Sequence, residues 1–219
     1  MKKITIIVFI AVLFTACATG GARDSSPGLR FAESEIAARA YIDFSGYSGP
    51  SPISAHQPPE GTQGSFSLDN GITGDGLRIS NIGDRAGQPL PAPVSIERFG
   101  EWMVAYNSNY LYFFIDNPEI READTLFMNV TFYDDSAGTF DVQYVNSIGH
   151  NPNYRPITVS KRGRRNLITT TVQLENCNFN GDVQNQDAQF RISDAARIQR
   201  VELILLDPSA DNRQTDDDF

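Results

Sequence analysis

The stretch from Leu126 to Tyr133, Leu-Phe-Met-Asn-Val-Thr-Phe-Tyr, decides the fold of this chain. Every second residue, starting with Leu126, is large and apolar, so these side chains fall on one face of an extended chain. The positions between them include Asn129 and Thr131 and form the opposite face. This alternation predicts a β-strand that buries one face in a core.

The same period of two recurs on both sides of this stretch. Further strands are expected at residues 41–44, 77–80, 94–99, 103–106, 110–115, 140–144, 168–174 and 198–206. No helical segments alternate with these strands, so a parallel α/β fold is not expected. The sequence therefore predicts an all-β protein with an antiparallel β-sandwich, because two half-apolar sheets must bury each other.

Two local predictions accompany the sandwich. Asn107-Ser108-Asn109 separates the expected strands 103–106 and 110–115 and predicts a hairpin that pairs them. Residues 30–40 contain two glutamates and several alanines, and this composition allows one short N-terminal helix before the first strand.

The N-terminus carries an export signal. Residues 1–16 combine a lysine pair, an apolar run of about eleven residues and a small Thr-Ala pair, which is typical of a signal peptide. The run is too short for a permanent membrane helix, which needs roughly 20 residues. Phe14-Thr15-Ala16-Cys17 resembles a bacterial lipobox, in which the cysteine is lipidated. The alternative is an ordinary secretory signal followed by an incidental cysteine.

The rest of the chain is expected to divide into tether, domain and tail. Residues 17–29 would form a lipidated, flexible tether that begins with Cys17. No acidic residue directly follows Cys17, which by bacterial sorting rules indicates an exported lipoprotein of the outer membrane. Residues 30–208 would form a single sandwich domain, and residues 209–219 an acidic disordered tail.

The chain is acidic, with 18 basic and 27 acidic residues and a net charge of −9. Removal of residues 1–16 takes away two lysines and leaves 16 basic residues, a net charge of −11. This balance argues against nucleic acid as a partner and against charge-driven binding to anionic lipid. If Cys17 carries lipid, Cys177 has no disulfide partner and is expected to be a buried small hydrophobe.

Six segments between about residue 104 and residue 206 share their order and spacing with one family. They are Leu111–Asp116, Val130–Asp135, Gly138–Tyr144, Thr169–Phe179, Ala188–Ile192 and Ile198–Leu203. They resemble the bacterial galactose-binding-like jelly-roll domain, which occurs alone on secreted proteins or attached to glycoside hydrolases. The resemblance implies a jelly-roll sandwich and, by analogy with related modules, carbohydrate binding, although a fold does not establish a function.

We therefore expect a non-catalytic glycan-binding lipoprotein of the bacterial envelope, with an aromatic platform beside polar side chains. The candidate ligand-binding residues are Trp102, Tyr154, Arg155 and Tyr47, of which the last three lie in expected loops. For Trp102, which starts an expected strand, packing in the core or at a sheet edge is the alternative. The alternative for the whole protein is a structural or protein-interaction envelope lipoprotein that binds no sugar.

The remaining candidates are acidic residues. Jelly-roll modules often hold a structural calcium ion, and Asp43 and Asp207 would come together to bind one if the first and last strands pair; otherwise they are exposed loop acids. Asp134 and Asp135 lie on an expected turn, where solvation or calcium is a better interpretation than catalysis. No HExxH, CxxC, GxSxG or P-loop motif is present. A glycan-cleaving hydrolase is the third possibility, and no catalytic residue is assigned.

Overall fold

A computed structural model gives the structure of the protein, and it describes residues 28–48, 65–67, 71–79, 94–147, 154–179, 188–193 and 196–210. The expected signal peptide, Cys17, nearly all of the tether and most of the acidic tail lie outside the described residues. Within the described residues, no helix is long and apolar enough to cross a membrane.

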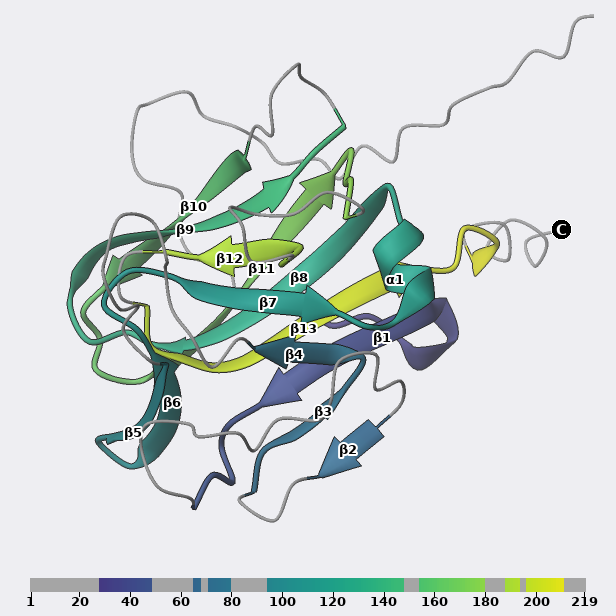
Figure 1. Ribbon diagram of the computed structural model, residues 1–219. Coiled ribbons are helices and arrows are strands. Elements are labelled where there is room, and N and C mark those ends of the chain that lie inside the picture. Colours follow the sequence, from purple (N-terminus) through teal and green to yellow (C-terminus); the bar gives the residue numbers. More distant parts are fainter. Residues whose placement is uncertain are drawn as a thin grey trace, which may run out of the picture.

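Two antiparallel sheets pack face to face, which confirms the predicted β-sandwich (Figure 1). The larger, eight-stranded sheet has the order β11-β8-β13-β1-β3-β2, and β6 pairs with both β13 and β5. The smaller, five-stranded sheet has the order β10-β9-β12-β7-β4. The eight strands are β1 Ile36–Asp43, β2 Ser65–Ser67, β3 Thr73–Asp75, β5 Ser95–Phe99, β6 Trp102–Tyr106, β8 Thr125–Tyr133, β11 Leu167–Glu175 and β13 Ile198–Leu206. The five are β4 Leu77–Ile79, β7 Leu111–Ile115, β9 Ala137–Val145, β10 Tyr154–Arg162 and β12 Phe190–Ile192.

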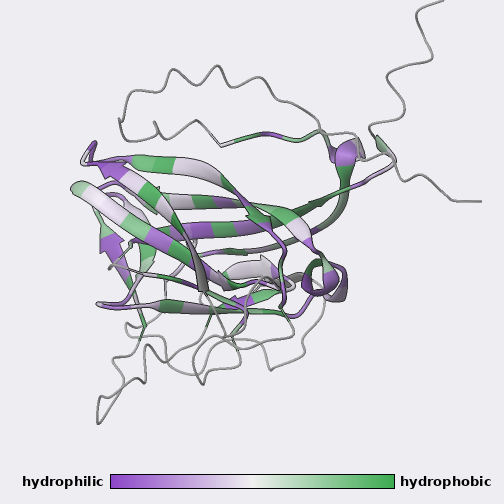
Figure 2. Ribbon diagram, turned by 90° about the horizontal axis from the view of Figure 1, so that it is seen from above, coloured by the Kyte–Doolittle hydropathy of each residue, from purple (hydrophilic) through white to green (hydrophobic). Residues whose placement is uncertain are grey.

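The core lies between the sheets, where the alternating apolar residues meet. Figure 2 shows apolar and polar residues alternating along the strands. The even-numbered residues of β8 from 126 to 132 are buried, as the alternation predicts. Across the sandwich, the ring of Phe132 meets that of Phe140 edge to face, with the ring centroids 4.9 Å apart. Phe113 and Phe190 stack in parallel at 4.7 Å within the smaller sheet.

The short N-terminal helix that the composition of residues 30–40 allows is present as a single turn. Only Glu33–Glu35 is helical, as a single 3-10 turn, and the chain then enters β1. β1 pairs with β13 along most of its length and turns Ala38 and Ala40 into the core. The strand pairing and this burial outweigh the preference of alanine for helix, which is a weak tendency.

The predicted hairpin around Asn107-Ser108-Asn109 is wrong, although both of its strands exist. β6 belongs to the larger sheet and β7 to the smaller one, so the turn carries the chain from one sheet to the other. The buried Asn107 side chain accepts a hydrogen bond from the Asn109 backbone N–H at 2.9 Å. Turn residues specify the local bend, but they do not specify which strands pair. β7 is paired along both edges, with β4 and with β12, and both of its faces are largely buried.

A short helix that the strand pattern does not predict, α1 Pro118–Glu122, follows β7. Its N-cap is Asn117, whose side-chain oxygen accepts a hydrogen bond from the Ile120 backbone N–H at 3.2 Å. Ile120 is buried and fixes the helix against the core.

Candidate functional site

The outer face of the larger sheet, which points away from the core, carries aligned polar side chains. The strand register places them in two rows that cross β11, β8, β13 and β1. The first row is Thr171, Asn129, Glu202 and Tyr41, and the second is Thr169, Thr131, Arg200 and Asp43. These rows place residues that are up to 157 positions apart in hydrogen-bonding contact.

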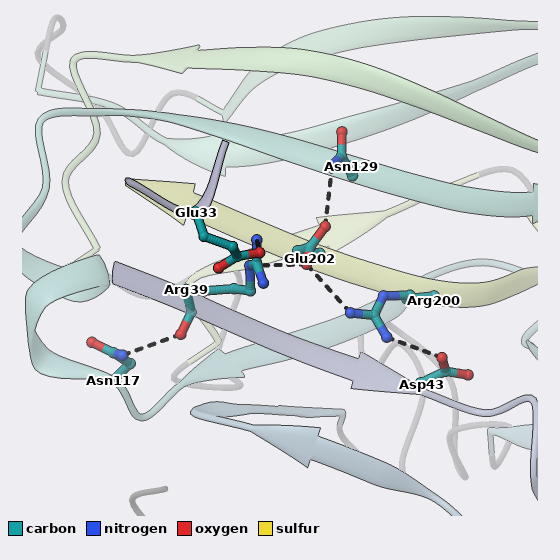
Figure 3. Close-up of polar contacts among 7 residues, drawn as sticks. All are labelled: Glu33, Arg39, Asp43, Asn117, Asn129, Arg200 and Glu202. Atoms are coloured by element: carbon teal, nitrogen blue, oxygen red, sulfur yellow. Dashed lines mark hydrogen bonds and ion pairs between the residues drawn. The ribbon is translucent and has the colours of Figure 1, made fainter. Parts of the chain in front are cut away.

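Glu202 is the centre of the polar contacts on this face, as Figure 3 shows. Its carboxylate accepts a hydrogen bond from the Asn129 amide at 3.1 Å and forms ion pairs with Arg39 at 3.2 Å and Arg200 at 3.3 Å. Arg200 also pairs with Asp43 at 3.1 Å, and Arg39 with Glu33 at 3.0 Å. The network orders the side chains before any ligand arrives.

Hydroxyl groups continue the network toward the edge strand β11. The hydroxyls of Thr131 and Thr169 are 2.8 Å apart, and Thr171 donates to the side-chain oxygen of Asn129 at 2.5 Å. This part of the face therefore offers neutral hydrogen-bonding groups beside the charged ones.

The N-terminal segment, residues 28–31, lies over one side of this face. The Leu29 backbone N–H donates to the Thr171 hydroxyl at 2.7 Å, and the Phe31 ring lies 5.0 Å from that of Phe127. Gly28 passes so close to β11 that a Cβ atom at this position would be 2.6 Å from a methyl group of Thr169. The segment therefore forms a wall beside the strands.

Wall and sheet enclose a groove of about 580 Å³, which we call the outer groove. This volume is within the range of roughly 300–1,000 Å³ that is usual for small-ligand sites. Most of the lining residues are polar, and they come from the N-terminal segment, three strands and the turn between β10 and β11. The lining residues are Gly28, Leu29, Arg30, Asn129, Thr131, Arg164, Leu167, Ile168, Thr169, Arg200 and Glu202.

An aromatic cluster, consisting of Phe99, Trp102 and Tyr133, lies beyond one end of the outer groove. Tyr133 follows Thr131 on the same face of β8, and its cross-strand partner is the groove residue Leu167. The Tyr133 ring is 5.5 Å from that of Trp102 and 5.4 Å from that of Phe99. The half-buried Trp102 thus packs at the sheet edge, and it does so next to the groove.

The structure places the other predicted ligand-binding residues elsewhere. Tyr47 is buried in the core, so its ring offers no face to a ligand, and this prediction is wrong. Burial also raises the pKa of its hydroxyl. The backbone of Tyr154 and Arg155 lies in β10, at the edge of the smaller sheet, and not in the expected loop. Their side chains lie outside the described part of the structure, and their strand is in a different sheet from Trp102.

The predicted calcium pair, Asp43 and Asp207, is also wrong. The first and last strands do pair, but they run antiparallel, with Asp43 opposite Arg200 and Ile36 opposite Leu206. The two aspartates therefore lie at opposite ends of the pair, separated by about seven residues of strand, or roughly 23 Å. Asp43 pairs with Arg200, and Asp207 accepts hydrogen bonds from the backbone and hydroxyl of Ser209. Among the described residues, no group of three or more His, Cys, Asp or Glu could hold a metal ion.

The two carboxylates of the acidic turn after β8 have partners within the protein and stabilise the fold. Asp134 is buried, and its carboxylate accepts hydrogen bonds from the backbone N–H groups of Arg162, Gly163 and Arg164 at 2.9–3.0 Å. Asp135 forms ion pairs with Lys161 and Arg197. Asp134 thus fixes the turn that brings Arg164 to the outer groove.

Cys177 is buried, as expected for a small hydrophobe. Burial, with a contribution from the negative charge of Asp124, raises the pKa of its thiol to about 12. A thiol in this state does not serve as a nucleophile near neutral pH.

The sequence contains the groove residues but not their arrangement. Asn129, Thr131 and Thr169 belong to the polar faces of alternating strands, which usually indicates solvent exposure. The partners of these strands are fixed by the sheet order, in which β13 lies between β8 and β1. One signal for the site was present in the sequence. Arg200 and Glu202 are two charged residues on the outer face of a mostly apolar strand.

Comparisons of the chain with models of protein families, with curated proteins and with solved structures find no match. Evidence for the function of the chain therefore comes from the chemistry of the outer groove.

Proposed function

We propose that the protein is a non-catalytic, glycan-binding lipoprotein of the bacterial outer membrane, and that the outer groove is its glycan site. The observation that carries this proposal is the composition of the groove, which combines hydroxyl, amide and guanidinium groups and has an aromatic cluster beyond one end. Sugar hydroxyls exchange hydrogen bonds with such groups, and pyranose faces stack on aromatic rings. The resemblance to galactose-binding-like domains supports the same function.

The described residues that line the groove do not include the acid pair that glycoside hydrolysis requires. Glycosidases use two carboxyl groups roughly 5–9.5 Å apart, one of which must deliver a proton. Of the described residues that line the groove, Glu202 alone is acidic. Its carboxylate is already engaged by Arg39, Arg200 and Asn129. This engagement favours a binding role over a catalytic one.

The test is a glycan array probed with the full-length chain in detergent, followed by titration of each glycan that binds. Thr131→Trp places a large ring in the groove and should abolish binding. Gln173→Trp introduces the same ring at an exposed position on the outer face of β11, outside the groove lining. This variant should bind glycan like the wild type. Trp102→Ala should weaken binding if the aromatic cluster stacks on the sugar.

Equal binding by the Thr131→Trp protein would show that the groove is not the site. Absence of binding to every glycan by a folded, monodisperse protein would overturn the proposed function. The protein would then be better described as a structural or protein-interaction lipoprotein, the alternative that the sequence leaves open.

The membrane anchor has its own test. Cys17→Ser removes the lipidated thiol, so the protein should move from the membrane fraction to the soluble fraction of cells. Retention of the variant in the membrane fraction, at the wild-type level, would contradict lipidation at Cys17.

A further inference from the structure

We propose that the outer groove selects anionic saccharides, whose carboxylate or sulfate groups are bound by Arg164 and Arg30. The inference rests on the proposed function, because it names the ligand class of the same groove. The charge of the groove contrasts with that of the whole chain. The chain has a net charge of −9, whereas the groove is lined by three arginines and one acidic residue.

The three arginines of the groove differ in their surroundings. Arg200 is compensated by Asp43 and Glu202, at 3.1 and 3.3 Å. Arg30 and Arg164 are exposed, and neither side chain forms an ion pair with any residue that the structure describes. The positive charge that remains available to a ligand is therefore on these two guanidinium groups.

A basic turn strengthens the positive potential at one end of the groove. Lys161-Arg162-Gly163-Arg164-Arg165 contains four of the 18 basic residues of the chain. Lys161 is paired with Asp135, and Arg162, Arg164 and Arg165 lie at the surface. In an acidic protein, such a cluster concentrates anions locally and raises their association rate.

The basic turn is held in place before a ligand binds. Asp134 accepts three backbone hydrogen bonds from residues 162–164, and its own carbonyl accepts one from the Arg165 N–H at 2.7 Å. Gly163 has a φ of +72°, and a Cβ at this position would be 3.0 Å from the backbone nitrogen of Ala137. A preformed turn loses less conformational entropy on binding, so its arginine can contribute more to affinity.

A saccharide fits this surface better than a membrane does. Arg164 and Arg30 border a recess that also contains the hydroxyls of Thr131 and Thr169, and these groups can reach only a ligand that enters the groove. The planar guanidinium group can bind a carboxylate or sulfate through two parallel hydrogen bonds. An acidic sugar supplies the anion and the neutral hydroxyls on one molecule.

The experiment compares acidic and neutral oligosaccharides of equal length by calorimetric titration of the full-length protein in detergent. The probes are an oligogalacturonate, a sulfated galactan oligosaccharide and a neutral galactan oligosaccharide. We expect one acidic probe to bind about tenfold more tightly than the neutral one at low salt, and to lose most of this advantage in 0.5 M NaCl. The better of the two acidic probes identifies carboxylate or sulfate as the preferred group.

Arg164→Gln and Arg30→Gln should each weaken the acidic probe about five- to tenfold and leave the neutral probe unchanged. Arg121→Gln is the matched control, because it removes the same charge from an exposed position on α1 outside the groove lining. Equal affinity for acidic and neutral probes would overturn this inference and leave glycan binding intact. Binding of neither class would remove the proposed function as well. Arginine-dependent binding to vesicles with 30% phosphatidylglycerol, without sugar binding, would identify a membrane surface instead.

Discussion

At the scale of single residues, the carboxylate of Asp134 connects two parts of the chain that lie about 30 positions apart. It is 2% exposed, and its oxygens accept hydrogen bonds from three successive backbone N–H groups. If the carboxylate is removed, these N–H groups lose their partner where water has limited access, and such a loss costs more than an ordinary hydrogen bond contributes.

We expect Asp134→Ala to lower the free energy of unfolding by about 2–4 kcal/mol. Glu97→Ala, at an exposed position of β5, should change it by less than about 0.5 kcal/mol. Urea unfolding followed by fluorescence measures both variants. A loss of less than 1 kcal/mol for Asp134→Ala would show that the turn does not depend on this carboxylate.

Cys177 gives a second prediction at this scale. Burial raises the pKa of its thiol from an ordinary value near 9.0 to about 12, so the native protein holds almost no thiolate at pH 8. A Cys17→Ser protein should therefore react with a thiol reagent such as DTNB only when urea unfolds it. Stoichiometric labelling within minutes in native buffer would contradict the burial of this side chain. Because unfolding releases the thiol proton above about pH 9, this group also lowers stability as the pH rises from 9 toward 12.

At the scale of elements, the strands were predictable and their partners were not. Alternation locates β8, β9, β11 and β13, because one-sided burial leaves a period of two in the sequence. The same alternation cannot reveal that β6 and β7 belong to different sheets. The alanines of β1 mislead in a similar way, since strand pairing with β13 is a long-range effect that local composition does not contain.

The loop ends next to β1 and β3 depend on two glycines that approach each other closely. Gly71 has a φ of +86°, and a Cβ there would be 1.9 Å from the Gly46 carbonyl oxygen. Gly71→Ala should therefore lower the free energy of unfolding by about 3 kcal/mol, through both the positive φ and the clash with backbone. Gly100→Ala is the control, because φ is +60° there but the nearest atom would be 3.7 Å away, and it should cost only about 1 kcal/mol. Equal losses in thermal or urea unfolding would mean that the glycine contact has no effect on stability.

At the scale of the whole molecule, Asp135 ties the two sheets together. It forms ion pairs with Lys161 of β10 in the smaller sheet and with Arg197, which precedes β13 in the larger sheet. Burial alone would raise the pKa of this carboxyl group, but the hydrogen bond and charge of Lys161 and the charge of Arg197 outweigh it and hold the pKa below 3.8. The ion pairs therefore stabilise the fold above the ordinary carboxyl pKa, and this stabilisation is lost as the pH falls through the lowered value.

We expect Asp135→Asn to be less stable than the wild type by about 1–2 kcal/mol at pH 7. The difference should begin to shrink below about pH 4, where the carboxyl group of the unfolded wild type binds a proton, and should shrink further until the pH falls below the lowered pKa of the native group. Urea unfolding of both proteins from pH 7 to pH 2.5 tests this. A difference that stays constant over this range would mean that the ion pairs do not contribute.

The sandwich was predictable because burial of two half-apolar sheets is a property of the entire sequence. The site was not, because the outer groove exists only where three strands, the turn between β10 and β11 and the N-terminal segment meet. Trp102 lies beside the outer groove, but Tyr47 is in the core and Asp43 is far from Asp207. These differences arise from strand order and direction, which single-sequence patterns do not specify.

Residues 28–31 form a wall of the outer groove and also continue directly into the expected tether. If Cys17 is anchored as we propose, any mechanical tension between the membrane and a bound glycan passes through this wall first. Its described attachments are the Leu29–Thr171 hydrogen bond and the contact between the rings of Phe31 and Phe127. Under tension, the few contacts of this short segment would break one after another. Pulling on the anchor would then open the groove and release the glycan before the sandwich itself unfolds.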